Sequence, residues 1–170
     1  MKTGIVSAMA AVLILLAGCG KKTSSSGGSS SPAEVPVTQP VMTAWQQGDK
    51  ATAVSKFVET DWSGRPLFAP GSALSLTEAE FSSLPVTDAQ SKESKEMVPQ
   101  LASLKQLAAA VIQAGRDAAA KGDLTQARKY FTSLKQFGAA LDSPDYTRIV
   151  QLVGQAFGQM ADKELAKVGQ

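Results

Sequence analysis

Apolar and small residues recur at alternating steps of three and four along two neighbouring stretches of this chain. The first stretch contains Leu101, Leu104, Ala108, Val111, Gly115 and Ala118, and the second contains Leu124, Ala127, Phe131, Leu134, Gly138 and Leu141. This spacing places each set on one face of an amphipathic helix. Between them, Lys121-Gly122 predicts a helix end, and Asp123 with Gln126 predicts the N-cap and capping box of the next helix. The pattern therefore predicts two antiparallel helices joined by a turn of about two or three residues.

A second copy of this turn occurs earlier in the chain. The stretch from Ala44 to Phe57 (AWQQGDKATAVSKF) aligns with the stretch from Ala118 to Phe131 (AAAKGDLTQARKYF). Both contain an alanine, a Gly-Asp pair, a second alanine and a phenylalanine at the same spacing. We therefore expect a second helical hairpin near the start of the folded part. A final helix over roughly 145–168 is expected to pack against the hairpins through Ile149, Val153, Ala156, Met160 and Leu165.

These hairpins resemble tetratricopeptide repeats. That family has a small residue where its two helices cross, another early in helix B and an aromatic one turn later, and Gly115, Ala127 and Phe131 stand at this spacing. The sequence departs from the family at Val111 and Ala118, where aromatic residues are usual, and lacks the closing proline. The resemblance implies a stack of helical hairpins, and a small helical bundle is the alternative. In both cases the expected fold is all-α, since no stretch alternates as a half-buried strand would.

The same resemblance implies a binding groove lined mainly by helix A. The matching outward positions are Ala109, Ile112, Arg116, Ala119 and Ala120. All of these except Arg116 are apolar, which favours hydrophobic helix-in-groove contact or packing within the chain. Arg116 is a candidate for pairing with an acidic partner, and the alternative is a solvated arginine on a helix surface.

An irregular insert over about 63–96 separates the two repeat copies. Glycines and prolines in SGRPLFAPGS predict an irregular connection, and Thr77 with Glu80 predicts the capping box of a short helix. Trp62, Arg65, Leu67 and Phe68 together form a candidate recognition patch on this loop. In the alternative, which we favour, Trp62 and Phe68 fill the gap between the first hairpin and the central helix while Arg65 stays solvated.

The N-terminus has the layout of an export signal. Lys2 precedes an apolar run from Ile5 to Ala17, which is too short to span a bilayer, and small residues lead to the only cysteine, Cys19. The segment Leu16-Ala17-Gly18-Cys19 resembles the lipobox of bacterial lipoproteins. This resemblance implies transfer of a diacylglycerol group to the Cys19 sulfur, cleavage just before Cys19 and usually N-acylation of the new terminus, with palmitate among the acyl chains. An ordinary signal peptide followed by a coincidental cysteine is the alternative.

The expected organisation follows from this leader. Residues 1–18 are predicted to be a lipoprotein signal peptide, residues 19–40 a lipidated cysteine with a disordered Ser/Gly/Pro tether, and residues 41–170 a single helical domain. The lipobox resemblance implies a lipid anchor in the bacterial cell envelope. Gly20 stands where an aspartate would resemble an inner-membrane retention signal, so the periplasmic face of the outer membrane is implied if the organism is Gram-negative.

Composition argues against several classes of function. The chain has no histidine, which excludes His-ligated metals and a Ser-His-Asp triad. Its 17 basic and 15 acidic side chains are interspersed, whereas nucleic-acid-binding proteins carry a one-sided basic patch. The closest acid pair, Glu78 and Glu80, would point about 200° apart on a helix. We therefore expect no metal, no cofactor, no nucleic acid and no enzymatic activity, and a carboxylate- or Lys/Tyr-based enzyme is the remaining alternative.

Together these features favour a lipid-anchored adaptor that binds a protein or a peptide. Its candidate partner-binding residues are Ile112, Arg116, Trp62 and Arg65. The alternative is a structural or assembly subunit of a larger membrane complex, which would contribute an anchor and bulk rather than a groove.

Overall fold

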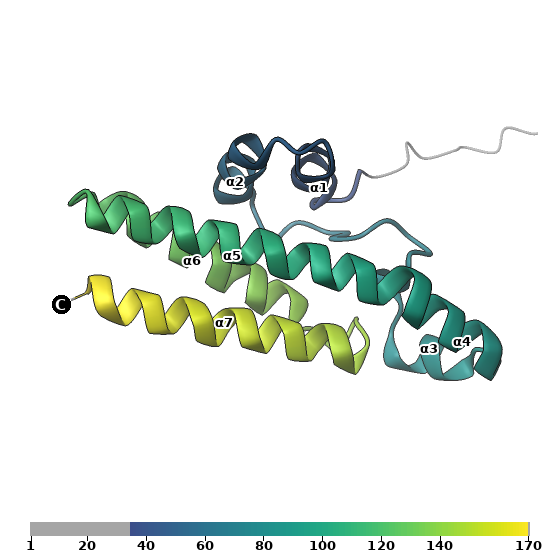
Figure 1. The fold of residues 1–170 in the computed structure, drawn as a ribbon. Coiled ribbons are helices and arrows are strands. Elements are labelled where there is room, and N and C mark those ends of the chain that lie inside the picture. The colour runs from purple at the N-terminus through teal and green to yellow at the C-terminus, as the bar shows by residue number, and fades with distance from the viewer. Residues whose placement is uncertain (1–34, 170) are drawn as a thin grey trace, which may run out of the picture. The chain divides into compact units, whose positions relative to one another are not determined.

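Helices make up most of the folded part of the chain, for which the computed structural model describes residues 35–169 (Figure 1). The α-helices are α1 (Gln39–Gln46), α2 (Lys50–Glu59), α3 (Glu78–Ser83), α4 (Val86–Lys92), α5 (Val98–Ala120), α6 (Leu124–Leu141) and α7 (Arg148–Val168). A 3₁₀ segment spans Ala73–Ser75 and a π-helical segment spans Glu93–Met97. No strand occurs within residues 35–169, which confirms the predicted all-α class. Cys19, the predicted signal peptide and the tether as far as residue 34 lie outside the described residues.

The two copies of the repeated sequence form the same turn. Gly48, between α1 and α2, and Gly122, between α5 and α6, have φ values of +80° and +82°, in the left-handed region that favours glycine. Asp49 and Asp123 then cap the following helices, since each Oδ1 accepts a hydrogen bond from the backbone N–H three residues on, at 3.0 and 2.9 Å. The predicted caps are confirmed. The capping box predicted for Asp123 and Gln126 does not form, because the backbone N–H of Asp123 donates to the carbonyl of Ala118 and not to the side chain of Gln126.

Glycines set the closest contacts among the three long helices. A Cβ atom on Gly115 of α5 would lie 2.5 Å from Cε1 of Phe131, so the ring of Phe131 packs directly on the backbone of α5. Between α6 and α7, a Cβ on Gly154 would lie 2.6 Å from the carbonyl oxygen of Gly138. The two backbones therefore touch at this crossing, which side chains on either glycine would force apart.

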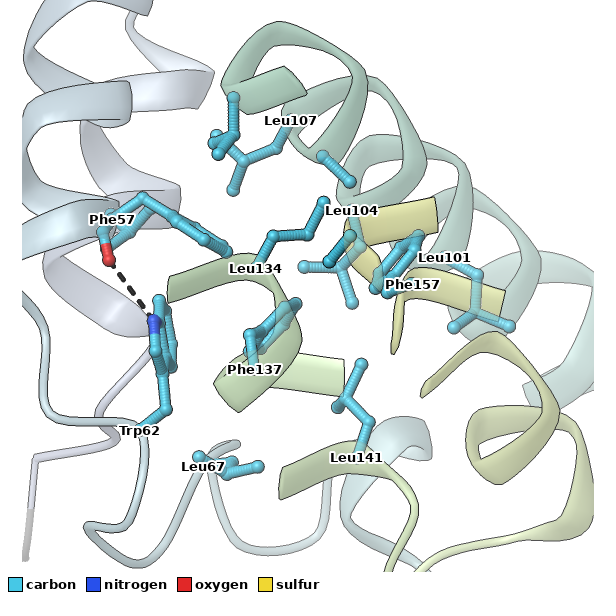
Figure 2. Packing of buried hydrophobic residues seen from close by; sticks show 14 of the residues in the cluster. Phe57, Trp62, Leu67, Leu101, Leu104, Leu107, Leu134, Phe137, Leu141 and Phe157 are labelled. Atoms are coloured by element: carbon cyan, nitrogen blue, oxygen red, sulfur yellow. Dashed lines mark hydrogen bonds between the residues drawn. The ribbon is translucent and has the colours of Figure 1, made fainter. Parts of the chain in front are cut away.

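Aromatic rings from distant parts of the chain fill the centre of the core (Figure 2). The Trp62 ring centroid lies 4.7 Å from that of Phe57 and 4.5 Å from that of Phe137. The indole N–H of Trp62 donates to the carbonyl of Phe57 and to Oγ of Ser133, both at 3.1 Å. Trp62 and Phe68 are both buried, as the packing alternative for the insert predicts. Trp62 is therefore part of the core and not of an exposed patch.

The central insert is packed against the rest of the fold, whereas the sequence predicts an irregular connection there. Leu67 and Leu74 are fully buried, and Thr38, just before α1, donates its hydroxyl to the carbonyl of Leu67. The backbone N–H of Val37 donates to the carbonyl of Pro66 at 2.9 Å. Helix α1 begins at Gln39, so the folded part begins slightly before the predicted boundary at residue 41. The second half of the insert is helical, since α4 continues through the π segment into α5.

The predicted buried stripe of α7 is wrong at Ile149, Ala156 and Met160, where the buried residue is the next one along the chain, about 100° around the helix axis. Val153 and Leu165 are partly buried and pack against the core. The residues that α7 buries are Val150, Gly154, Phe157, Ala161, Glu164 and Val168. Ile149 and Met160, which the sequence pattern places in the core, are each 38% exposed. The contact between Gly154 and Gly138 fixes this rotation, because only a glycine on α7 can approach the backbone of α6 so closely.

Candidate functional site

A groove runs between α5 and α7, the teal and yellow helices of Figure 1, and encloses about 590 Å³. Helix α5 contributes Lys105, Ala109, Ile112, Gln113 and Arg116 to its lining. Helix α7 contributes Ile149, Leu152, Val153, Ala156, Phe157 and Met160. Volume and lining are typical of a binding site, since such sites are concave and mostly apolar, with a few polar groups.

The groove is apolar because α7 carries two adjacent apolar faces. One face, with Val150, Gly154 and Phe157, is buried in the core. The other face is open to solvent, where Leu152 is 48% exposed and Ile149 and Met160 are 38% exposed. Single exposed apolar residues are common on protein surfaces, whereas these three lie along one side of the same helix.

The positions that the repeat resemblance implies fall partly in this groove. Ala109, Ile112 and Arg116 line it, with Ile112 buried in its floor, whereas Ala119 and Ala120 are not among the lining residues. Sequence reasoning assigned the α7 side of the groove to the core. A wider apolar arc on α7, which includes Leu152 as well as the predicted stripe, is the signal in the sequence that indicates a second apolar face.

Arg116 belongs to a small charge cluster at one end of the groove. Its Nη2 lies 2.6 Å from Oε1 of Glu164, and Nζ of Lys167 lies 2.8 Å from the same oxygen. The hydrogen bond from Arg116 lowers the pKa of Glu164 to about 2, although burial of the carboxylate opposes this shift. The same hydrogen bond, which Glu164 accepts, raises the pKa of Arg116. Two cations share one carboxylate, so the cluster keeps an excess positive charge.

A second cation lies on the same side of the groove. Lys105 is exposed on α5, and it forms no ion pair with any residue in the part of the chain that the structure describes. The lining contains no carboxylate, since Glu164 is not among the lining residues. The α5 edge is therefore cationic, while the α7 edge is apolar.

A smaller cavity of about 390 Å³ adjoins the groove near the start of α7 and shares Ile149 and Leu152 with it. Phe81 of α3 and Met97 of the π segment form its far wall. Oε2 of Glu78 accepts a hydrogen bond from the backbone N–H of Arg148 at 2.7 Å, which holds α3 against the first turn of α7. The concave surface thus continues from the groove toward α3, where its lining includes Glu78, Glu93 and Arg148 as well as apolar side chains.

Arg65, the other charged candidate, lies away from the groove. Its Nη1 donates to the hydroxyl of Tyr146 at 2.6 Å, and its guanidinium lies 5.5 Å from the centre of the Tyr146 ring. Burial raises the pKa of the Tyr146 hydroxyl. A cavity of about 510 Å³ surrounds this pair, and it also includes the acids Glu80 and Asp145. Arg65 is thus exposed but held by a contact within the chain, and the structure does not bring it together with Ile112 and Arg116.

Within residues 35–169, no three His, Cys, Asp or Glu side chains gather closely enough to hold a metal ion. None of the helices described there combines the length and apolarity that a bilayer span requires. Comparisons of the chain with protein-family models, with curated proteins and with solved structures give no match.

Proposed function

We propose that this chain is a lipid-anchored lipoprotein of the bacterial cell envelope that binds a protein or a peptide in the α5/α7 groove. The observation that carries the proposal is the second apolar face of α7. Its residues Ile149, Leu152 and Met160 belong neither to the core nor to the side chains packed against it, and α7 packs into the core through Val150, Gly154 and Phe157. An apolar row outside the core, beside a concave surface, is best explained by a partner that covers it.

The N-terminal sequence supports the anchor. The thiol of Cys19, within a lipobox-like segment, would receive a diacylglycerol group, and two or more acyl chains hold a soluble domain stably at a bilayer. The Ser/Gly-rich stretch after it would act as a flexible spacer between the bilayer and the helices. The resemblance of the hairpins to tetratricopeptide repeats supports the same function, because helix A lines the groove in that family. In a Gram-negative organism the protein would face the periplasm from the outer membrane.

A second candidate function is that of an assembly subunit in a larger membrane complex. The observation that favours it is exposed apolar surface outside the groove, on the arm formed by α4 and the start of α5. Val86 is 72% exposed and Val98 is 49% exposed. A subunit embedded in a complex would cover this arm as well as the groove.

One purification series tests the proposal and separates the two functions. The acylated full chain is purified from its native membrane as wild type, Leu152→Glu and Val86→Glu, and co-purifying proteins are identified and quantified. An adaptor loses its partner with Leu152→Glu and retains it with Val86→Glu, because only Leu152 lines the groove. An assembly subunit, which is covered at the arm as well as the groove, loses partners with Val86→Glu as well as with Leu152→Glu, and the wild type retains them at fixed stoichiometry. A Cys19→Ser variant that remains as firmly bound to the membrane as the wild type would contradict the anchor.

A further inference from the structure

We infer that the α5/α7 groove receives one amphipathic α-helix of a partner protein, with carboxylates along the flank that faces α5. This inference rests on the proposed function of the groove and adds the shape and the charge of the partner.

The arrangement of the long helices leaves a place for one more helix. Helix α6 packs against α5 at Gly115 and against α7 at Gly154. The groove-lining residues Leu152 and Ala156 lie on a different face of α7 from Gly154. A helix in the groove would therefore contact α5 and α7 from another side than α6 does, which completes a four-helix arrangement.

The chemistry of the lining also favours a helix over an extended peptide. An extended segment needs hydrogen-bond partners for its backbone N–H and C=O groups, and burying these groups unpaired is costly. The polar side chains in the lining are Lys105, Gln113 and Arg116, all on α5, and α7 contributes apolar residues. A helix satisfies its own backbone groups and presents only side chains, so it suits this surface.

The length of the groove matches about three helical turns. Ile149 and Met160 mark its ends on α7, and eleven residues at 1.5 Å each separate them by about 16 Å. Lys105 and Arg116 lie eleven residues apart on α5, which gives the same separation of about 16 Å. A partner helix with two carboxylates about eleven positions apart on one flank would thus bring one to Lys105 and one to the charge cluster that Arg116 forms with Glu164 and Lys167.

Charge argues against a second copy of this chain as the occupant. The lining offers two cations and no carboxylate. In a symmetric pair of grooves, each copy would bring the same cations. Arg116 is already paired with Glu164, but Lys105 would gain no counter-charge from the lining of either copy. A helix of another protein with an acidic flank would supply the carboxylates that the groove lining lacks.

The test measures binding of synthetic helical peptides to the full chain. The peptides, about 18 residues long, share one apolar face and carry Glu, Gln or Lys at two flank positions eleven apart. We expect the Glu peptide to bind about tenfold or more tightly than the Lys peptide at low ionic strength, with the difference shrinking as salt is added. Lys105→Glu should reduce or reverse that preference. Leu152→Glu should weaken binding of every peptide about tenfold or more, and the matched variant Val86→Glu should leave it unchanged.

The outcomes separate this inference from the proposed function. If the Glu, Gln and Lys peptides bind equally well, and Leu152→Glu abolishes the binding of all three, the acidic flank of the partner is overturned. The proposed function of the groove would remain. If none of the helical peptides binds, but the Leu152→Glu variant still loses a native partner that the wild type retains, only the inference of a helical occupant is overturned. A full chain that is dimeric in solution and becomes monomeric with Leu152→Glu would replace the foreign helix with a second copy. Circular dichroism of each variant shows that it has folded.

Discussion

The guanidinium of Arg116 on α5 lies 2.6 Å from the carboxylate of Glu164 on α7, and this contact joins the two walls of the groove at one end. Glu164 is the buried partner, whereas Arg116 is half exposed. Lys167 adds a second cation at 2.8 Å from the same carboxylate oxygen. A buried carboxylate with two cationic neighbours strongly favours its charged form, so this contact makes the stability of the fold depend on pH.

Acid should weaken the fold through Glu164. Its pKa is about 2 in the folded chain and 4.5 in the reference state, so its contribution is complete above pH 4.5 and is lost as the pH falls toward 2. Because water screens the exposed cations, we expect about 1 kcal/mol at neutral pH. Urea unfolding of the wild type and of Glu164→Gln over this pH range measures this contribution as the difference between their free energies of unfolding. That difference should disappear in acid. Asp162→Asn, which removes the exposed pair with Lys135, is the matched control and should change little.

The contact between α6 and α7 predicts opposite effects at two glycines of the same helix. Gly154→Ala places a methyl group 2.6 Å from the carbonyl oxygen of Gly138, and backbone cannot move aside as a side chain can. We expect a loss of about 2–3 kcal/mol in the free energy of unfolding. Gly158→Ala meets no atom within 4 Å and should stabilise the helix by up to about 1 kcal/mol. Equal effects of the two substitutions in thermal unfolding would contradict the crossing described here.

The buried hydroxyl of Ser133 links α2, α6 and the central insert. It donates to the carbonyl of Phe57 at 3.0 Å and accepts the indole N–H of Trp62 at 3.1 Å. Ser133→Ala removes both bonds but leaves the direct bond from Trp62 to Phe57, so we expect a loss of about 1 kcal/mol. Ser103→Ala removes an exposed bond to a carbonyl on the same helix and should change stability by less than about 0.5 kcal/mol. Chemical denaturation of the two variants provides the comparison.

The two apolar faces of α7 should respond differently to substitution. Phe157→Ala removes a ring from the core and should cost about 3–5 kcal/mol. Leu152→Ser changes a half-exposed side chain and should shift stability by about 0.5 kcal/mol or less. Melting curves of the purified variants distinguish them. A large loss with Leu152→Ser would mean that this face supports the fold and is not kept for a partner.

Local signals in the sequence were sufficient for the turns and caps. The Gly-Asp pairs predict both hairpin turns, because a left-handed glycine and an aspartate cap depend only on neighbouring residues. The rotation of α7 could not be predicted in this way. It depends on the contact between Gly154 and Gly138, which are distant in the sequence, and a pattern that scores apolar residues gives no weight to glycine.

The groove was predictable on one side only, for the same reason. Ile112 and Arg116 follow from the helix A positions of the repeat resemblance, and the structure places both in the lining. Ile149 and Met160 were assigned to the core because they fit an apolar stripe equally well. Trp62 was a candidate for recognition because aromatic residues suit both roles, and only its contacts with Phe57 and Phe137 place it in the core.

The most direct test of the binding face is to measure stability and partner binding together in Leu152→Glu. We expect the acylated full chain with this change to melt within a few degrees of the wild type but no longer to retain its partner from the native membrane. Val86→Glu, at an apolar position that is 72% exposed, should retain it. Undiminished partner recovery by a well-folded Leu152→Glu variant would contradict the assignment of the α5/α7 groove as the binding site.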